Sequence, residues 1–334
     1  VYVDVEKGIA PSTEQRLAGA GAPNLPRADD ENEYVRLRKL VYERAHQFES
    51  ELAGAEQAHN ELSSGICRVM DELSFGNRLE LSTIKSGVNA MLDSVLRNPS
   101  AFLWVNRLKK ADSYTYSHLI STSIWCAVFG RHLGLARPQL EDLTLGGLLL
   151  DVGKAKLPVE LLKKTGRLTE QEFELIQSHV DYGVRILAET RNISPAVMRM
   201  VATHHERWNG HGYPMGLKGK QISVFGRIAG LIDSFAAMTA PRPFSRGVSP
   251  HDAVREFYEQ RGTVFESALV EQFIRACGIY PTGSLVELSS GEVAVVVGLE
   301  SAMRLRPKVM VVLDKDKRPC TKMRTIDLSA AGQE

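Results

Sequence analysis

Residues 145–158 read "LGGLLLDVGKAKLP" and combine an apolar run with two opposite charges. The leucines before Asp151 are typical of a helix in a protein core, and Pro158 marks the end of the segment. Asp151 and Lys154 therefore stand at the end of a buried helix. Because burying a charged group without a partner is unfavourable, we expect Asp151 to belong to a polar cluster inside a helical core.

The composition is that of a globular protein: 334 residues, 43% of them hydrophobic and 24% charged. The 41 Lys and Arg residues nearly balance the 40 Asp and Glu residues, so the net charge of +1 provides no global basic field for DNA or RNA. The four cysteines lie far apart and form no CxxC pair, which is typical of reduced thiols in the cytoplasm. No apolar run is long enough to span a bilayer and no signal peptide opens the sequence, so we expect a cytoplasmic protein.

The sequence predicts a mainly α protein with four regions. Residues 1–33 contain a short strand, "VYVDVE", and a linker rich in Ala, Pro and Gly. Because so short a strand is not stable alone, we expect it to end an N-terminal β domain that begins upstream. Residues 34–99 predict a helical connecting region, residues 100–280 a helical bundle domain, and residues 281–334 a small antiparallel β lobe.

In the connecting region we expect two helices between Tyr34 and Leu96, with the break at about Ser64–Gly65. Apolar residues form an amphipathic stripe along them. The members of this stripe are Val41, Ala45, Phe48, Leu52, Ala55, Leu62, Ile66 and Val69. The stripe predicts packing against the next domain. A homodimer through the helices of residues 34–97 is the alternative, which the alanines and His59 in the seam disfavour.

Helical periodicity continues through the third region, and the last region alternates. The predicted helices cover residues 101–110, 113–134, 138–152, 169–190, 194–207, 223–239, 250–260 and 266–277. A capping box at Thr169 and Glu172, and Ser-Pro starts at Ser194 and Ser249, support three of these boundaries. After Pro281, the stretches "SLVEL", "EVAVVVGL" and "KVMVVLD" predict about three antiparallel strands.

Histidines and carboxylates collect in the same helical domain. They are His118, Asp151, His179, His204, His205 and Asp233, with Glu206 beside the histidine pair. Asp233 is notable because it lies in the apolar run "IAGLIDSFAAM", where an ionised carboxylate needs a cation or a metal. Imidazole and carboxylate donors without a thiolate favour iron or manganese, with zinc possible. Such an ion generates a nucleophile from water and neutralises phosphoryl charge, and Lys154 is placed to meet a phosphate.

These motifs resemble those of the HD-GYP domains, bacterial metal-dependent phosphodiesterases that hydrolyse cyclic di-GMP to pGpG or GMP. The resemblance rests on "HHERWNGHGYP", "RIAGLIDSFAAMTAPRPF", "LDVGK", "KTGRLT" and "HVDYG". It covers about residues 105–280 and continues into "IYPTGSLVELSSGE". In addition, "VYVDVEKG" resembles the end of the small β domain, DUF3391, that often precedes HD-GYP domains. The resemblance implies membership of cyclic di-GMP signalling.

The resemblance also implies a role for each matching residue. Asp151 would bridge two metal ions. One ion would be completed by His179, His204 and His205, and the other by His118 and Asp233. Lys154 would contact phosphate and act with Asp151 in catalysis. The signature loop is Gly212, Tyr213 and Pro214, which would shape the site and contact other signalling proteins, while Tyr213 and Arg242 are candidate substrate contacts.

Three positions depart from the family pattern. The histidine of the HD pair is Leu150, the aspartate before the signature loop is Asn209, and the second aspartate of the Asp233 helix is Ala236. Leucine cannot donate to a metal, so the resemblance implies one or two ions with the second weakened, unless water or Glu206 substitutes. Two main hypotheses follow: a working phosphodiesterase, or a non-catalytic cyclic di-GMP receptor or interaction module. A third, a phosphohydrolase of other nucleotides, is disfavoured by the signature loop.

Overall fold

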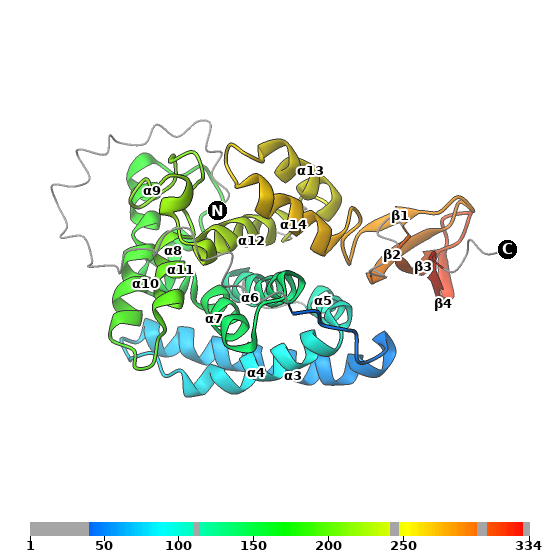
Figure 1. Ribbon diagram of the computed structural model, residues 1–334, viewed down its shortest axis with the longest axis horizontal. Coiled ribbons are helices and arrows are strands. Elements are labelled where there is room, and N and C mark those ends of the chain that lie inside the picture. Colours follow the sequence, from blue (N-terminus) through cyan, green and yellow to red (C-terminus); the bar gives the residue numbers. More distant parts are fainter. Residues whose placement is uncertain (1–39, 110–113, 241–246, 299–305, 330–334) are drawn as a thin grey trace.

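The computed structural model describes residues 40–109, 114–240, 247–298 and 306–329. A helical body, formed by residues 48–277, carries a small β sheet at one end (Figure 1). The predicted β-domain remnant and linker, residues 1–33, lie outside the described residues, as does the segment that resembles DUF3391. The mainly α fold with a C-terminal antiparallel β unit is confirmed.

Two long helices, α3 (Phe48–Ser74) and α4 (Ser82–Arg97), form an antiparallel hairpin. The predicted break at Ser64–Gly65 is wrong, because α3 continues through it. A Cβ on Gly65 would lie 2.9 Å from the Thr83 carbonyl oxygen, and one on Gly87 would lie 2.8 Å from the Leu62 Cα. These glycines allow the two helices to approach closely, and do not interrupt them.

The predicted start of the first helix at Tyr34 is also wrong for the part that the structure describes. Residues 40–47 are not helical, and Val41 is 89% exposed. From Phe48 onward the apolar stripe is buried inside the chain, with Ala55, Leu62 and Ile66 fully covered. From Phe48 onward, the predicted packing of the stripe against the helices that follow is confirmed, whereas Val41 and Ala45 are exposed.

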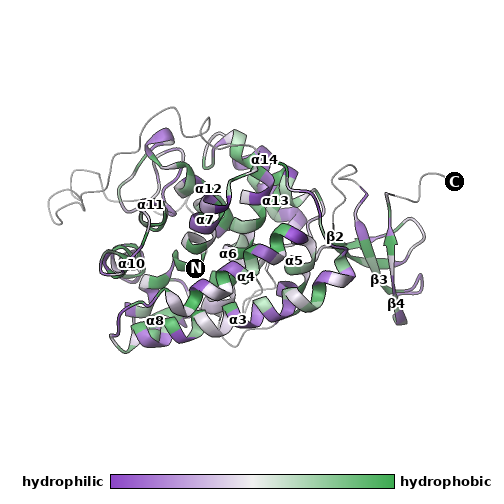
Figure 2. Cartoon of the chain, turned by 60° about the horizontal axis from the view of Figure 1, so that its bottom comes forward, coloured by the Kyte–Doolittle hydropathy of each residue, from purple (hydrophilic) through white to green (hydrophobic). Residues whose placement is uncertain are grey.

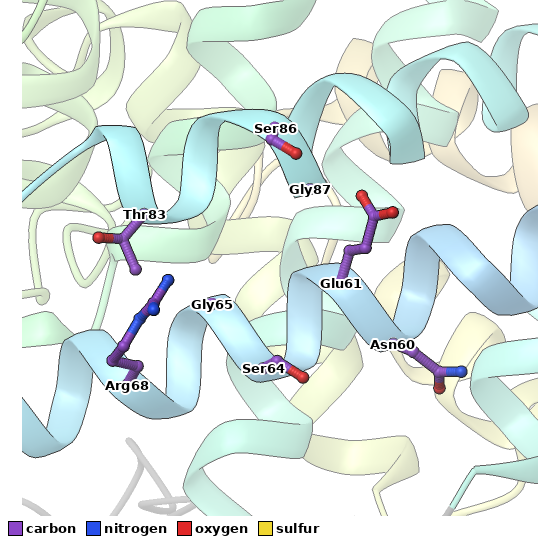
Figure 3. Close-up of a pocket in the computed structure, with 8 residues that line it drawn as sticks. All are labelled: Asn60, Glu61, Ser64, Gly65, Arg68, Thr83, Ser86 and Gly87. Atoms are coloured by element: carbon purple, nitrogen blue, oxygen red, sulfur yellow. The ribbon is translucent and has the colours of Figure 1, made fainter.

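The outer face of the hairpin is polar. Between α3 and α4 it carries an open groove of about 460 Å³ (Figure 3). The groove is lined by Asn60, Glu61, Ser64, Gly65, Arg68, Thr83, Ser86 and Gly87. Since the apolar stripe is already covered, this polar face is what the hairpin presents to solvent.

The bundle domain follows the predicted helices closely. Its first elements are α5 (Pro99–Leu108), α6 (Tyr114–Leu133), α7 (Arg137–Leu149), the 3₁₀ helix η1 (Val152–Lys156) and α8 (Val159–Leu162). They are followed by α9 (Glu170–Gln177), α10 (His179–Ala188), α11 (Pro195–Thr203), η2 (Gly219–Gln221), α12 (Val224–Thr239), α13 (Pro250–Gln260) and α14 (Ser267–Cys277). Helix α12 is buried along nearly its whole length and forms the axis of the core.

The capping predictions hold where the structure tests them. The Thr169 hydroxyl accepts a hydrogen bond from the Glu172 amide at 3.2 Å, and the Glu172 carboxylate accepts one from the Thr169 amide at 2.7 Å. Ser194 and Ser249 each cap a helix that begins with proline. The helix predicted over 169–190 is instead two helices, α9 and α10, which meet at Ser178. The helix predicted over 194–207 ends at Thr203, so that the histidine pair follows it.

The C-terminal sheet has four strands, not the predicted three. They are β1 (Leu285–Glu287), β2 (Val293–Gly298), β3 (Lys308–Leu313) and β4 (Pro319–Asp327), in that order and all antiparallel. Strand β4 escaped prediction because it is an edge strand whose sequence, "PCTKMRTID", is mostly polar. The sheet has a small core of its own, made by Ala294, Val296, Val309 and Val311. Figure 2 shows hydrophobic residues, in green, on the strands of this sheet.

Candidate metal centre

The predicted site residues come from five places in the chain and meet inside the bundle. His118 lies on α6, His179 begins α10, and Asp233 lies in the middle of α12. Asp151 lies between α7 and η1, and the pair His204–His205 follows α11. Donor atoms of these residues form two groups, each within 4.8 Å: Asp151, His179, His204 and His205, and then His118, Asp151 and Asp233. The structure therefore brings together all six of the residues expected to bind metal.

The first group is arranged as a set of metal ligands would be. The Asp151 Oδ1 atom lies 3.1 Å from the Nε2 atom of His179 and 3.9 Å from that of His204. These three buried atoms have no hydrogen-bond partner among the described residues. Buried polar atoms normally have one. Their convergence therefore fits a cation between them.

The backbone fixes the orientation of two of these imidazoles. The Nδ1 atom of His179 lies 2.6 Å from the Ile176 carbonyl oxygen, and the Nδ1 atom of His204 lies 2.8 Å from that of Val201. A carbonyl can only accept, so each Nδ1 carries the proton and donates it. The Nε2 lone pairs are then left pointing into the site, which is the arrangement that a metal-binding histidine needs.

Burial sets the charge of the site. It lowers the pKa of His204 to about 4 and that of His205 well below its usual range, so both imidazoles are neutral at pH 7. For Asp151, burial raises the pKa, but the nearby Lys154 ammonium and the imidazoles outweigh it and hold the pKa well below its usual range. Neutral imidazoles and an ionised carboxylate are the forms that bind a metal.

The second group is bonded within itself. The Nε2 atom of His118 lies 2.8 Å from the Asp233 Oδ1 atom and 3.7 Å from the Asp151 Oδ2 atom. The Lys154 ammonium lies 2.5 Å from the same Oδ2 atom. Leu150, at the position where the resemblance implies a histidine, is 1% exposed and belongs to the main hydrophobic core. Position 150 therefore adds no donor atom to this group.

Close packing around glycine positions the turn that carries Asp151 and Lys154. A Cβ on Gly153 would lie 1.9 Å from the His179 carbonyl oxygen and 2.5 Å from the Gly183 amide nitrogen. Only glycine lets η1 lie this close to α10. The "DVGK" sequence therefore places Asp151 against the imidazole of His179.

The signature loop packs directly on the histidine pair. The Tyr213 ring stacks on His205 with centroids 4.5 Å apart, and a Cβ on Gly212 would lie 2.4 Å from the His205 carbonyl oxygen. The Tyr213–Pro214 peptide bond is cis. Tyr213 is half-buried, and its pKa is raised well above its usual range by burial. The loop thus forms one wall of the site. Arg242, the other expected substrate contact, lies outside the described residues.

Two residues that the sequence did not single out as loop supports hold this wall in place. Glu206 accepts hydrogen bonds from the Met215 amide at 2.7 Å and the Leu217 amide at 2.8 Å, so its carboxylate is used by the loop and does not replace the missing ligand. Arg207 donates to the His204 carbonyl oxygen at 2.9 Å. A buried glutamate directly after two histidines was the available signal for the first. Of the substituted positions, Asn209 caps the loop turn at the His211 amide, and Ala236 is buried on α12.

Comparison with known proteins agrees with this geometry. Residues 100–269 match the HD domain family, and residues 285–332 match the KOW domain associated with the HD domain. The chain is 33% identical over 286 residues to a cyclic di-GMP phosphodiesterase of Pseudomonas aeruginosa, covering 86% of this chain and 69% of that protein.

Other relatives are matched over a smaller share. A 3′3′-cGAMP-specific phosphodiesterase of Vibrio cholerae is 34% identical, over 55% of this chain and 36% of its own length. A cyclic di-GMP phosphodiesterase of Thermotoga maritima is 33% identical, over 49% of this chain and 45% of its own length. The chain thus spans less than half the length of these two relatives.

Among solved structures, an HDG"Y"P protein from Bdellovibrio bacteriovorus shares the fold. Its TM-score is 0.54 at 16% identity, over 66% of this chain and 70% of that one. Within the described residues, no helix is both long and apolar enough to cross a membrane. The family matches, the relatives and the shared fold lead to one conclusion: the chain is a member of the HD-domain family and of its HD-GYP group.

Proposed function

We propose that this protein hydrolyses a phosphodiester bond of cyclic di-GMP in a metal-dependent reaction. The observation that carries the proposal is the first ligand group, in which three buried donor atoms converge without hydrogen-bond partners among the described residues. The names of the relatives support this substrate.

In this proposal Asp151, His179, His204 and His205 hold the metal, and iron or manganese suits their donor set best. A divalent ion there would supply the Lewis acidity that activates water and neutralises charge on phosphate. The Lys154 side chain is 17% exposed and its ammonium has three N–H donors, so it can donate to Asp151 and to a phosphate oxygen at the same time. Tyr213, and Arg242 beyond the described residues, would contact the nucleotide.

The residues around the ion would orient its ligands and exclude water from the site. The Nδ1–H groups of His179 and His204 hold the imidazoles on their backbone carbonyls, so neither ring can rotate away from the centre. The stacked Tyr213 ring covers His205 and excludes water from that side. Loss of the histidine at position 150 should lower the rate by at least the 10–100-fold that loss of supporting residues alone costs.

Hydrolysis can be tested on the purified protein with added Mn²⁺ or Fe²⁺. We expect release of pGpG or GMP from cyclic di-GMP, measured by chromatography. A His179→Ala variant should release none, while His251→Asn, which changes a partly exposed histidine on α13 outside the ligand groups, should match the parent. A parallel reaction with 3′3′-cGAMP tests the substrate of the other relatives. If the parent protein released no product from either nucleotide, hydrolysis would be refuted.

The alternative function is a cyclic di-GMP receptor or a protein-interaction module, and Leu150 is the observation that favours it. Tight nucleotide binding without product would support the receptor. Binding of another signalling protein through Gly212, Tyr213 and Pro214 belongs to the same alternative. A homodimer through residues 34–97 is the other part of this alternative, and the polar outer groove of α3 and α4 is one surface that it could use, because the apolar stripe is covered from Phe48 onward. Light scattering after gel filtration would detect it.

A further inference from the structure

We infer that this site holds a single divalent ion, and that the Lys154 ammonium takes the place of a second one. The inference rests on the proposed metal site at Asp151 and names how that site differs from a two-metal centre. It follows from how the two oxygens of Asp151 are used, from the state of His118 and Asp233, and from the rigidity of the Lys154 turn.

The two oxygens of Asp151 face different cations. Its Oδ1 atom faces the Nε2 atoms of His179 and His204, where the donor atoms converge without partners among the described residues. Its Oδ2 atom forms an ion pair with the Lys154 ammonium at 2.5 Å. In a two-metal centre, a bridging carboxylate gives one oxygen to each ion. Here the cation on Oδ2 is an ammonium, which would repel a divalent ion beside it.

The remaining donors of the second group bind each other. The Nε2 atom of His118 makes a hydrogen bond of 2.8 Å with Asp233. One imidazole nitrogen cannot use the same position for a proton shared with a carboxylate and for a lone pair given to a metal. The next donor would come from position 150, where leucine has no lone pair and packs in the core. A second ion would therefore find no free set of ligands.

The turn that carries Lys154 holds the ammonium in place. Lys154 follows Asp151 by three residues, and its amide also donates to the Asp151 carbonyl oxygen at 2.9 Å. Gly153 presses this turn against α10, and the Lys156 ammonium donates to the Leu73 carbonyl oxygen at 2.6 Å, which joins η1 to the end of α3. Both anchors fix the backbone on either side of Lys154. The ion pair is thus a built part of the site.

Metal stoichiometry tests this inference without any nucleotide. The protein is loaded with Mn²⁺ and dialysed, its metal content is measured by mass spectrometry, and its electron paramagnetic resonance spectrum is recorded. We expect one Mn²⁺ per chain with the spectrum of an isolated ion. Leu150→His alone should keep one ion, because the Lys154 ammonium still holds Asp151 Oδ2. For Leu150→His combined with Lys154→Met we expect a second ion and the spectrum of a coupled pair, because position 150 then supplies a donor and Asp151 Oδ2 is released. Lys163→Met, which removes an exposed lysine from the end of α8, should keep one ion.

Three results would overturn the inference: a coupled pair of ions in the parent protein, a coupled pair in Leu150→His alone, or a single ion in the double variant. If the double variant does not fold, as judged by circular dichroism, Leu150→His combined with Lys154→Gln takes its place with the same expectation. The outcomes separate the two proposals. One ion without hydrolysis refutes only the proposed function, two ions with hydrolysis refute only this inference, and a protein that binds no ion refutes both.

Discussion

The contact between Gly212 and the histidine pair provides a sharp test of how the loop supports the site. In Gly212→Ala, the new Cβ would lie 2.4 Å from both the Glu206 Cα and the His205 carbonyl oxygen, and 2.5 Å from the Arg207 amide nitrogen. Ordinary contacts begin at 3.4 Å. All three atoms belong to the backbone, so the loop as a whole must move away by about 1 Å.

Such a displacement of the loop has two effects on the residues beside the site. It breaks the 4.5 Å stack with Tyr213, and it pulls the loop amides away from the Glu206 carboxylate. Loss of support around a metal ligand typically weakens metal binding or activity by about 10–100-fold, and overpacking lowers the free energy of unfolding by about 1–3 kcal/mol. We expect both effects in Gly212→Ala.

Mn²⁺ affinity from calorimetry and unfolding midpoints in urea measure these effects. The matched control is Gly166→Ala, because a Cβ there meets no atom within 4 Å. We expect the control to bind Mn²⁺ as the parent does. If Gly212→Ala also bound Mn²⁺ with the parent's affinity and unfolded at the same urea concentration, the argument that the loop positions His205 would be refuted.

Three further predictions concern stability. Arg97→Met leaves the Glu51 carboxylate, which is 2% exposed, without its two guanidinium hydrogen bonds, and should lower the free energy of unfolding by about 3 kcal/mol, as measured in urea. In Glu206→Gln, the side-chain NH₂ group replaces one of the two oxygens that accept from the loop amides, so one loop N–H loses its acceptor. We expect the free energy of unfolding to fall by about 1–3 kcal/mol, which is measured as a lower melting temperature. In the metal-free protein, the pKa of His204 is about 4 in the folded state and about 6.5 when unfolded, so this imidazole's contribution is fully present above pH 6.5. As the pH falls from 6.5 toward 4, this contribution is lost, and the free energy of unfolding decreases by at most about 3 kcal/mol. Urea midpoints that stay equal between pH 7.5 and pH 5 would contradict the last prediction.

The sequence predicts those parts of the fold that depend on residues within one helical turn. It does not predict the parts that depend on contacts between residues far apart in the chain. The capping residues Thr169 and Ser194 act within one helical turn, so their positions are legible in the sequence. The continuity of α3 through Gly65 depends on the carbonyl of Thr83 in another helix, which no local pattern shows. Strand β4 likewise is held by pairing with β3, although its own side chains are mostly polar.

The site shows the same division. The six expected metal ligands could be named from the sequence, because their residue types and their motifs are distinctive, and the structure brings them together. The sequence could not show that one oxygen of Asp151 faces His179 and the other faces Lys154. It also could not show that Glu206 accepts hydrogen bonds from the loop amides. Both facts depend on the path of the backbone between elements that lie far apart in the chain.

The ion pair between Asp151 and Lys154 also explains how the chain accommodates Leu150. A carboxylate that is 1% exposed needs a counter-charge whether or not a metal is bound, and Lys154 provides it from the same turn. The burial of Asp151 therefore does not depend on a second ion. A histidine at position 150 would put a polar ring among core side chains, whereas leucine adds about 1.5–3 kcal/mol of apolar burial. Leucine at this position thus favours the stability of the fold, and the lysine keeps Asp151 ionised and able to bind one metal.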